Sequence, residues 1–281
     1  MTDRIETFGE SLIQHGSHSE RAYLMKMSSD DLPELIPYLD HLALANGYTK
    51  IFAKVPEAVE WQLRKDGYRT EATIPEFYRG EQEVTFMGKY FVAERAREPH
   101  PELVRKVLEA ARAKHAEATL VALTDGLSCR RLLPEDATDM TAVYREVFAT
   151  YPFPIHDAGY LRETMASHVI YLGIFSGLQL VAIASAELDR KGQNAEMTDF
   201  ATLPDQRGKG LANHLLAELE KAAVQEGITT AYTIARAYSF GMNITFAKNS
   251  YEFAGTLTRN TQISGNLESM NVWYKTLGAA G

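Results

Sequence analysis

The pattern of hydrophobic and polar positions predicts a chain in which helices alternate with strands. Two apolar runs, residues 169–175 and 178–188, flank Ser176-Gly177 and indicate a hairpin. Apolar residues at helical spacing indicate an amphipathic helix over residues 209–226. The pattern also predicts strands over residues 129–133, 195–202, 229–237, 251–257 and 268–277, and helices over residues 101–119, 136–150 and shortly after 237. Helices interleaved with a sheet of mixed direction indicate an α/β or α+β fold.

A segment in the first third of the chain and a segment near its end share one pattern. In each, a strand leads into a helix and then into two further strands. Lys54 stands 13 residues before Gly67, and Arg236 stands 14 residues before Ser250. We interpret this as a duplicated strand–helix–strand–strand unit, and chance similarity of two such units is left open.

The composition is that of an ordinary globular protein, with 281 residues of which 45% are hydrophobic and 23% charged. The sequence contains no apolar run long enough to cross a bilayer and no apolar signal core near its start, so we expect a cytoplasmic protein without membrane contact. The single cysteine, Cys129, excludes an intramolecular disulfide, and we expect no metal. A net charge of −8 argues against nucleic acid as a partner.

A glycine-containing turn provides the strongest chemical signal in the sequence. The predicted strand ends near Leu203, the chain passes through Gly208 and Gly210, and the amphipathic helix begins. Such a turn exposes consecutive backbone N–H groups at the positive end of a helix dipole, and both favour a phosphate. Glycine is suited to these positions because a Cβ would restrict the backbone angle or the approach of the anion. The turn therefore predicts a phosphate or pyrophosphate site.

This turn resembles the motif of the GNAT acetyltransferases, Gln/Arg-x-x-Gly-x-Gly/Ala, with a departure at Asp205. The resemblance implies that residues 127–281 form a catalytic GNAT fold with a mixed central sheet and acetyl-CoA as the acetyl donor. From the duplicated unit we interpret residues 1–100 as a smaller, degenerate GNAT-like domain that is structural or shapes the substrate site, and residues 101–126 as a connecting helix and linker. The first domain lacks a glycine turn of this kind.

The resemblance also implies the residues that hold acetyl-CoA. Backbone amides of the turn would hold the pyrophosphate, and the end of the preceding strand would bind pantetheine and polarise the acetyl carbonyl. The helix asparagine of the family is displaced, with Ser239 in its place and Asn243 one turn later. The implied cofactor-binding residues are Ala201, Thr202, Leu203, Arg207, Gly208, Lys209, Gly210, Leu211, Ala212, Ser239 and Asn243.

Acetylation of an amine requires removal of the ammonium proton. Glu196 occupies the position of the catalytic base in several family members, and Asp199 is a second candidate that could bind a cationic substrate instead. Because they are three residues apart on a strand, we expect their side chains on opposite faces, and a solvated or capping role for each is left open. Phe246 replaces the tyrosine that serves the family as general acid, so water, Tyr238, Ser239 or no acid at all would serve the leaving thiolate.

The loop over residues 151–160 corresponds to the variable acceptor loop of the family. We take Tyr151, Phe153, His156 and Asp157 as candidate substrate-binding residues, although a loop of this composition can also simply pack on the sheet. Arg236 is a further substrate-binding candidate.

Nearly the whole chain, including residues 71–80, 196–204 and 268–275, resembles the bacterial and archaeal β-lysine N-acetyltransferases. The resemblance implies acetylation of the ε-amine of β-lysine to the compatible solute Nε-acetyl-β-lysine. A diamino acid would need a carboxylate partner and a cationic one, for which Glu196, Asp199, Lys54 and Arg236 are available. Another amine (a polyamine, an amino acid or an antibiotic), a non-catalytic acetyl-CoA sensor and a homodimer are left open.

Overall fold

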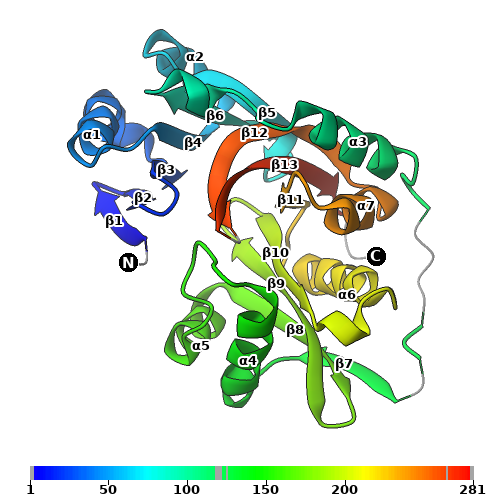
Figure 1. Cartoon of the computed structure of the whole chain (residues 1–281). Helices are drawn as coiled ribbons and strands as arrows, with labels where there is room; N and C mark the ends of the chain where they lie inside the picture. Colours follow the sequence, from blue (N-terminus) through cyan, green and yellow to red (C-terminus); the bar gives the residue numbers. More distant parts are fainter. Residues whose placement is uncertain (1–2, 118–121, 125, 264, 279–281) are drawn as a thin grey trace.

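The computed structural model describes residues 3–117, 122–124, 126–263 and 265–278, and these residues form one sheet of 13 strands covered by helices (Figure 1). The strand order is β1-β2-β3-β4-β6-β5-β12-β13-β11-β10-β9-β8-β7. Strands from the N-terminal part of the chain occupy one end of the sheet, and strands from the C-terminal part occupy the other. The chain is therefore built as two halves that share a single sheet.

The N-terminal half begins with three antiparallel strands and continues through two crossover helices. Its elements are β1 (Arg4–Phe8), β2 (Ser11–Gly16), β3 (Arg21–Lys26), α1 (Leu32–Ala45), β4 (Lys50–Pro56), α2 (Glu57–Lys65), β5 (Arg69–Tyr78) and β6 (Gln82–Tyr90).

The helix α3 (Pro101–Arg112) connects the two halves. The elements of the C-terminal half are β7 (Leu127–Arg131), α4 (Ala137–Val147), α5 (Ala158–Ser167), β8 (Val169–Ser176), β9 (Gln179–Asp189), β10 (Asn194–Thr202), α6 (Leu211–Gln225), β11 (Thr230–Arg236), α7 (Phe240–Lys248), β12 (Glu252–Ile263) and β13 (Asn266–Thr276). The helices α4 and α6 contact the strands β9 and β10, and α3 packs against α7.

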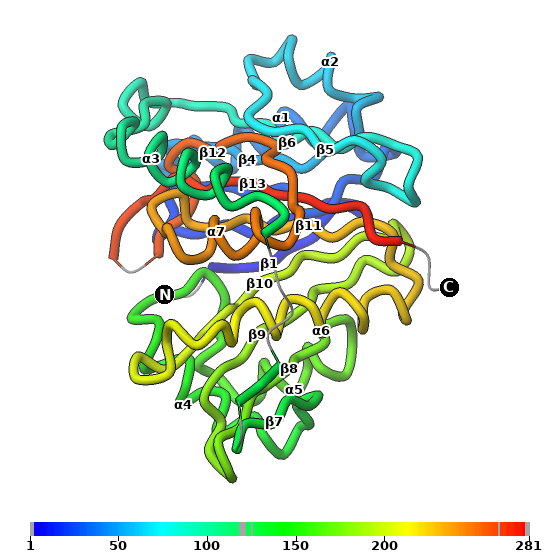
Figure 2. Tube along the Cα trace, turned by 90° about the vertical axis from the view of Figure 1, so that its right-hand side faces the viewer, coloured from blue at the N-terminus to red at the C-terminus, as the bar shows by residue number. Residues whose placement is uncertain are grey.

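The two halves repeat one topology. In the N-terminal half, β2 pairs antiparallel with β3, β3 parallel with β4, and β4 and β5 each antiparallel with β6. In the C-terminal half, β9, β10, β11, β12 and β13 pair in the same way. The correspondence extends further than the strand–helix–strand–strand unit expected from the sequence, because it also includes the preceding antiparallel strand pair and the helices α1 and α6. In Figure 2 the strands β10 to β7 lie below β12 and β13.

The halves meet where β5 lies against β12. Gly255 of β12 pairs with Ala72 of β5, and a Cβ at Gly255 would lie 2.1 Å from the carbonyl oxygen of Glu71. Only glycine permits this approach of the two backbones. A core shared by both halves supports the junction: Phe52 and Phe86 from one half pack in a cluster with Leu257 of the other.

Most of the elements expected in the C-terminal half are present. The hairpin turns at the expected residues, and the strand and helix around the glycine turn agree to within two residues with β10 and α6. The helix expected over residues 101–119 instead ends at Arg112, because Ala116 has φ 57° and donates its backbone N–H to the carbonyl of Ala247. Residues 118 and 119 lie outside the described part of the chain.

Candidate active site

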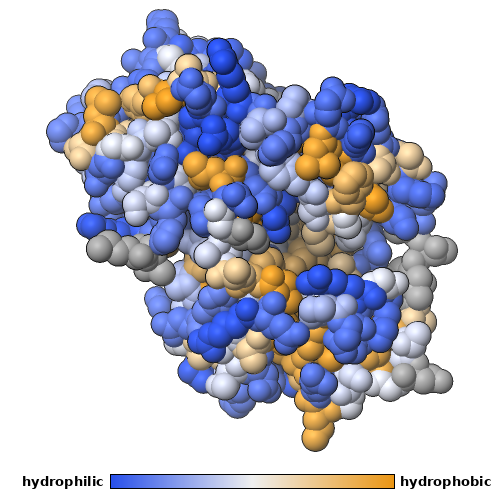
Figure 3. All heavy atoms as spheres, viewed as in Figure 1, coloured by the Kyte–Doolittle hydropathy of each residue, from blue (hydrophilic) through white to orange (hydrophobic). Residues whose placement is uncertain are grey.

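The strands β10 and β11 separate in the centre of the C-terminal half. They pair only over Asn194–Glu196 and Thr230–Tyr232. Beyond this point β10 follows β9 and β11 follows β13, with a bulge in β10 between Thr198 and Ala201. Asp199 in this bulge has φ 54°, a conformation that non-glycine residues rarely adopt. The separation opens a gap between α6 and α7, where Figure 3 shows apolar surface.

The glycine turn lies at the edge of this gap, immediately before α6. Gly208 and Gly210 have φ 79° and 75°, and no heavy atom lies within 4 Å of a Cβ built on either residue. Gly210 is the N-cap of the 15-residue helix α6, whose first N–H groups have no partner within the helix. Arg207 and Lys209 add positive charge. Open space, free N–H groups and positive charge at the start of a helix are features that suit a phosphate group.

The backbone amides near the turn are not all available to a ligand. The N–H of Leu203 donates to the carbonyl of Val181 at 3.0 Å, and that of Arg207 reaches the carbonyl of Pro204 at 3.4 Å. Because N–H groups alternate in direction along a strand, Thr202 directs its N–H toward the gap while Ala201 and Leu203 face β9. Amide contacts from Ala201 and Leu203 are therefore incompatible with this geometry, whereas Thr202 and Gly208 to Ala212 remain candidates.

Ser239 and Asn243 have structural roles. Ser239 caps α7, since its hydroxyl accepts from the N–H of Met242. The buried Asn243 amide donates to the carbonyls of Arg236 and Ser239, and its oxygen accepts from Asn271 and Trp273. The hydrogen bonds of Asn243 are thus used within the protein, so its expected contact with the cofactor is not supported.

A cavity of about 740 Å³ adjoins the gap and lies between the two halves of the chain. Its lining includes Arg21, Tyr23 and Lys54 from the N-terminal half and Glu196 and Tyr232 from the C-terminal half. Both halves thus form the wall of one cavity. A pocket of this size suits a small organic substrate.

Five acidic residues line the cavity, and three of them, Glu187, Glu196 and Asp199, lie on the adjoining strands β9 and β10 together with Ser185. The other two are Glu81 and Asp189. Glu187 lies opposite Glu196 in the β9–β10 register. The expectation that Glu196 and Asp199 point to opposite faces is wrong, because the bulge in β10 interrupts the alternation between them. The sequence does not point to Glu187, because its place opposite Glu196 depends on the register between β9 and β10.

Glu196 has a strongly perturbed acidity. Burial, reinforced by the negative charge of Glu187, raises the pKa of Glu196 to about 7, while Lys54 and a hydrogen bond with Tyr232 oppose the shift. Lys54 Nζ in turn lies 3.1 Å from the Tyr232 hydroxyl. A carboxylate with a pKa near neutrality is suited to accept and return a proton.

Asp199 is held by two hydroxyl groups. Its oxygens accept hydrogen bonds from Tyr151 and from Ser185, each at 2.6 Å. Burial raises the pKa of Asp199, and these two hydrogen bonds counteract the rise. Asp199 is thus a fixed carboxylate, whereas Glu196 is the one with a pKa suited to proton transfer.

The acceptor-loop candidates separate into two groups. Tyr151 and Phe153 line the cavity, as expected. His156 and Asp157 line a different, smaller depression, and Asp157 caps α5 by accepting the N–H of Gly159 at 2.7 Å. A weakly amphipathic helix, α5, thus begins within the segment that the sequence analysis treats as a loop.

Arg236 reaches the cavity but is engaged in an ion pair. Its guanidinium contacts both carboxylate oxygens of Glu268, at 2.6 and 2.9 Å.

Phe246, which stands at the position of the family's general acid, also lines the cavity and packs edge-to-face on Phe200. Tyr238 instead donates its hydroxyl to Glu98 at 2.6 Å and is not among the cavity residues, so it is poorly placed as a general acid.

A gap between parallel strands beside an anion-binding turn, opening on a carboxylate-lined cavity, is the arrangement of a CoA-dependent acyltransferase. The acetyltransferase (GNAT) family model matches residues 138–241. The chain is 36% identical to the beta-lysine N(6)-acetyltransferase of Methanococcus maripaludis over 97% of its own length and 98% of that protein. The chain therefore belongs to the GNAT family, and it is an acetyl-CoA-dependent N-acetyltransferase.

Two further relatives align with about half of the chain. A beta-lysine N(6)-acetyltransferase of Methanosarcina mazei is 38% identical over 55% of this chain and 57% of that protein. The N-acetyltransferase YodP of Bacillus subtilis is 36% identical over 55% of this chain and 56% of that protein.

Within the described residues, no three His, Cys, Asp or Glu side chains group as a metal site requires, and no helix is long and apolar enough to cross a membrane.

Proposed function

We propose that the chain acetylates the ε-amine of β-lysine, with acetyl-CoA as donor. The observation that carries the proposal is the cavity between the two halves, where carboxylates from the C-terminal half face cationic residues from the N-terminal half. A diamino acid presents ammonium groups and a carboxylate, and this distribution of charge matches both. The relative aligned with nearly the whole chain carries the name of this activity.

Glu196 is proposed as the general base. A primary ammonium must lose a proton before its nitrogen becomes nucleophilic, and the Glu196 carboxylate accepts that proton. Its pKa of about 7 leaves a substantial fraction ionised at neutral pH and makes the carboxylate more basic than an exposed one. Tyr232, whose hydroxyl lies 3.1 Å from Lys54 Nζ, lines the cavity together with Glu196.

Asp199 and Glu187 are proposed to attract and hold the cationic acceptor. Asp199 is fixed by Tyr151 and Ser185, so its charge is held in place before the substrate arrives. Glu187 has His168 Nε2 as a neighbour at 3.6 Å, and it lies opposite Glu196 on the adjacent strand β10. Like charges close together are unfavourable in the empty site, and a bound ammonium relieves this repulsion.

The donor site is proposed to comprise the gap and the glycine turn. Thr202 and the amides from Gly208 to Ala212 would hold the donor, with the pyrophosphate at the start of α6. Acetyl-CoA supplies an acetyl group activated as a thioester, which the neutral amine attacks. Apolar side chains such as Phe200 and Phe246 exclude water from the adjoining cavity.

Residues 1–100 are proposed to be a degenerate GNAT-like domain that completes the acceptor pocket, with residues 101–126 as the connection to the catalytic domain. The repeated topology and the contribution of Arg21, Tyr23 and Lys54 to the cavity support this division. The start of α1 has no glycine turn and carries Asp30, Asp31 and Glu34 instead. We therefore expect one acetyl-CoA per chain.

The proposal is tested by following CoA thiol release with β-lysine, L-lysine, spermidine and an aminoglycoside antibiotic. We expect the highest kcat/KM with β-lysine, and NMR of the product should place the amide on the ε-nitrogen. A higher kcat/KM with another amine would contradict the proposed substrate. Binding of acetyl-CoA without turnover of any amine would favour a sensor and contradict catalysis of this reaction.

A further inference from the structure

Arg21 is a buried cation in the wall of the active-site cavity. It is the first residue of β3, and only 4% of its surface is exposed. It lines the same cavity as Glu196 although it belongs to the other half of the chain. Removing a guanidinium from water is costly unless a partner compensates the charge, so the partners of Arg21 are informative.

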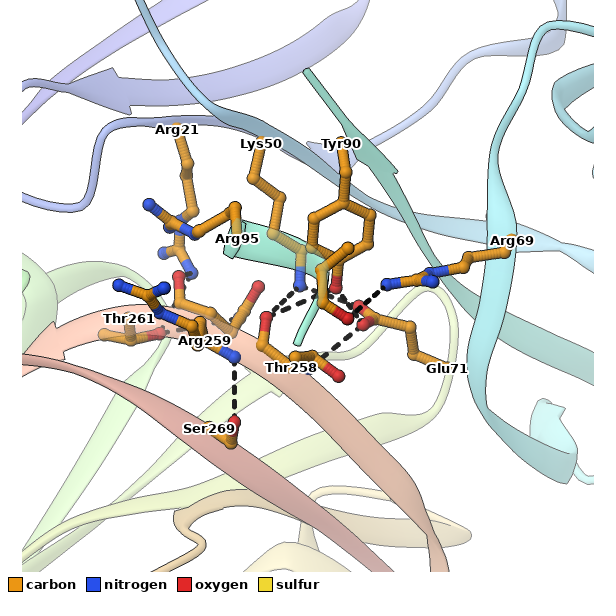
Figure 4. Close-up of polar contacts among 12 residues, drawn as sticks. Arg21, Lys50, Arg69, Glu71, Tyr90, Arg95, Thr258, Arg259, Thr261 and Ser269 are labelled. Carbon is orange, nitrogen blue, oxygen red and sulfur yellow. Dashed lines mark hydrogen bonds and ion pairs between the residues drawn. The ribbon is translucent and has the colours of Figure 1, made fainter. Parts of the chain in front are cut away.

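The contacts of Arg21 within the protein are with neutral groups. Its Nη1 donates to the carbonyl of Asn260 at 2.7 Å and to the hydroxyl of Thr261 at 2.9 Å (Figure 4). The guanidinium carbon lies 5.1 Å from the ring centre of Tyr23 and 5.6 Å from that of Phe52. These contacts fix the side chain in one orientation without neutralising it.

Within the part of the chain that the structure describes, no carboxylate oxygen lies within 4.0 Å of the Arg21 guanidinium, and its hydrogen bonds use Nη1 alone. Asp3 and Glu196 influence it from farther away. Nε and Nη2 therefore remain as donors for a ligand in the cavity. A guanidinium presents such donors in a planar fork that matches a carboxylate.

Three other buried or half-buried cations near Arg21 each have a carboxylate partner, whereas the half-buried Lys54 contacts the hydroxyl of Tyr232. Lys50 lies 2.7 Å from Glu71, and Arg236 lies 2.6 Å from Glu268. The buried Arg95 has Glu20 at 3.6 Å. A buried arginine without such a partner, facing a substrate cavity, indicates that the substrate supplies the anion.

We infer that Arg21 binds the carboxylate of the acceptor and so selects amino acids over amines that lack this group. The inference rests on the proposed function for the identity of the acceptor. The ammonium groups of a diamino acid would lie near the carboxylates of the cavity, and its carboxylate would lie at Arg21. Each charged group of the substrate would then have a partner of opposite charge. A polyamine would leave Arg21 unpaired, and the penalty for that buried cation produces the selectivity.

The test compares acceptors that differ only in the carboxylate. β-Lysine is paired with 1,4-diaminopentane, and L-lysine is paired with 1,5-diaminopentane, so each diamine is the decarboxylated form of its amino acid. For the wild-type enzyme we expect kcat/KM for the amino acid to exceed that of its partner by roughly 10- to 150-fold in the better pair, the range for hydrogen bonds to charged groups. Equal values within that pair would overturn the inference.

Variants then assign the preference to Arg21. We expect Arg21→Gln to reduce the amino-acid preference to within about 3-fold of unity, mainly by raising KM for the amino acid, with Arg21→Lys in between. Arg79→Gln is the matched control, because Arg79 also lines the cavity but is exposed and donates to the Lys191 carbonyl. The control should keep the preference.

Additional measurements distinguish a change in amino-acid preference from a folding defect and from a wrong assignment of the substrate. Thermal unfolding and the KM for acetyl-CoA monitor the integrity of each variant, and the wild-type comparison needs no variant. If Arg21→Gln lowers kcat/KM equally for both members of a pair, Arg21 is structural and the inference fails. If L-lysine rather than β-lysine is the better acceptor, the proposed substrate fails, while a preserved carboxylate preference that depends on Arg21 still supports the inference.

Discussion

The two halves of the chain have the same strand order and yet differ at the point where a GNAT site binds its donor. After β10 the chain passes through Gly208 and Gly210 into α6, with open space beside both glycines. After β3 the chain passes through serine and aspartate residues into α1, and acidic side chains occupy the first turns. A phosphate would meet N–H donors in the first case and negative charge in the second. The same topology therefore supports a donor site in only one half.

The central parallel strands of the halves differ as well. The strands β3 and β4 stay paired over four positions, Arg21–Leu24 with Lys50–Ala53. The strands β10 and β11 pair over three positions, after which a bulge turns β10 away. The strands β3 and β4 supply Arg21 and Lys54 to the cavity. In our proposal the C-terminal half binds the donor, and the N-terminal half contributes side chains to the acceptor site.

The largest expected effect tests the acid–base role of the C-terminal half. Glu196→Gln keeps the shape of the side chain and removes the proton acceptor, so kcat should fall by roughly 10²- to 10⁴-fold. In the wild type, kcat/KM should rise with pH through about pH 7 as Glu196 ionises. Acetyl-CoA affinity, measured by calorimetry, should not change. Near-normal turnover in the variant would make Glu196 structural.

The second prediction concerns the junction of the halves. Lys50 is fully buried and donates to Glu71 at 2.7 Å and to the Thr258 carbonyl at 2.9 Å, while Glu71 also accepts from Tyr90 and from the Thr258 N–H (Figure 4). Burial lowers the pKa of Lys50 to about 8 despite Glu71. Glu71→Ala leaves this cation unpaired and should reduce the free energy of unfolding by roughly 3–5 kcal/mol in urea titrations.

The control for this prediction changes both partners. Lys50→Met combined with Glu71→Leu removes both charges, so the double variant should be more stable than Glu71→Ala alone. Arg64→Ala disrupts an exposed ion pair with Glu60 in the same half and should cost less than about 1 kcal/mol. Equal losses for Glu71→Ala and Arg64→Ala would show that the junction does not depend on the buried pair.

The third prediction tests the difference between the two helix starts. Gly210→Asp adds bulk, negative charge and strain at φ 75°, and should weaken acetyl-CoA binding by about 100-fold or more. The matched change in the other half, Asp30→Gly, should leave the affinity and a stoichiometry of one per chain unaltered. Isothermal titration calorimetry measures both quantities. A second bound CoA, or full affinity in Gly210→Asp, would contradict the comparison.

The smallest predicted effect is a dependence of stability on pH. The folded-state pKa of Glu196, about 7, lies above its unfolded value near 4.5, so the folded state retains the proton more strongly. This stabilisation is complete below about pH 4.5 and is lost as the pH rises to about 7. Relative to wild type, Glu196→Gln should therefore gain roughly 1–3 kcal/mol at pH 8 and almost nothing at pH 4.5. Equal differences at both pH values would refute the elevated pKa.

Local signals explain which elements could be predicted from the sequence. The turn and the helix α6 depend on neighbouring residues, as does the hairpin at Gly177, and these elements lie where expected. The helix α1 is not among the elements predicted from the pattern, and Pro37 inside it is a residue that ordinarily argues against a helix. The helix α5 is weakly amphipathic, and its cap at Asp157 resembled a loop residue.

The active site depended more on long-range geometry. The position of Glu196 followed from the motif, but the bulge that brings Asp199 to the same cavity has no clear local signal. Arg21 joins the site only because β3 and β12 belong to one sheet, and no spacing along the chain indicates its contact with Thr261. Whether a backbone amide such as that of Leu203 is free to bind a ligand likewise cannot be predicted without the strand register.

The single continuous sheet has a consequence for how such an enzyme can diversify. The glycine turn proposed to bind the donor lies in one half, and Arg21 and Lys54 lie in the other. Mutations in the N-terminal half can therefore alter which acceptor is bound without disturbing the turn. The core shared by the two halves, which includes Phe52 and Leu257, keeps the relative position of the halves fixed when such residues are substituted. In the proposed arrangement, a substitution at Arg21 or Lys54 therefore changes the acceptor wall and leaves the glycine turn before α6 unaltered.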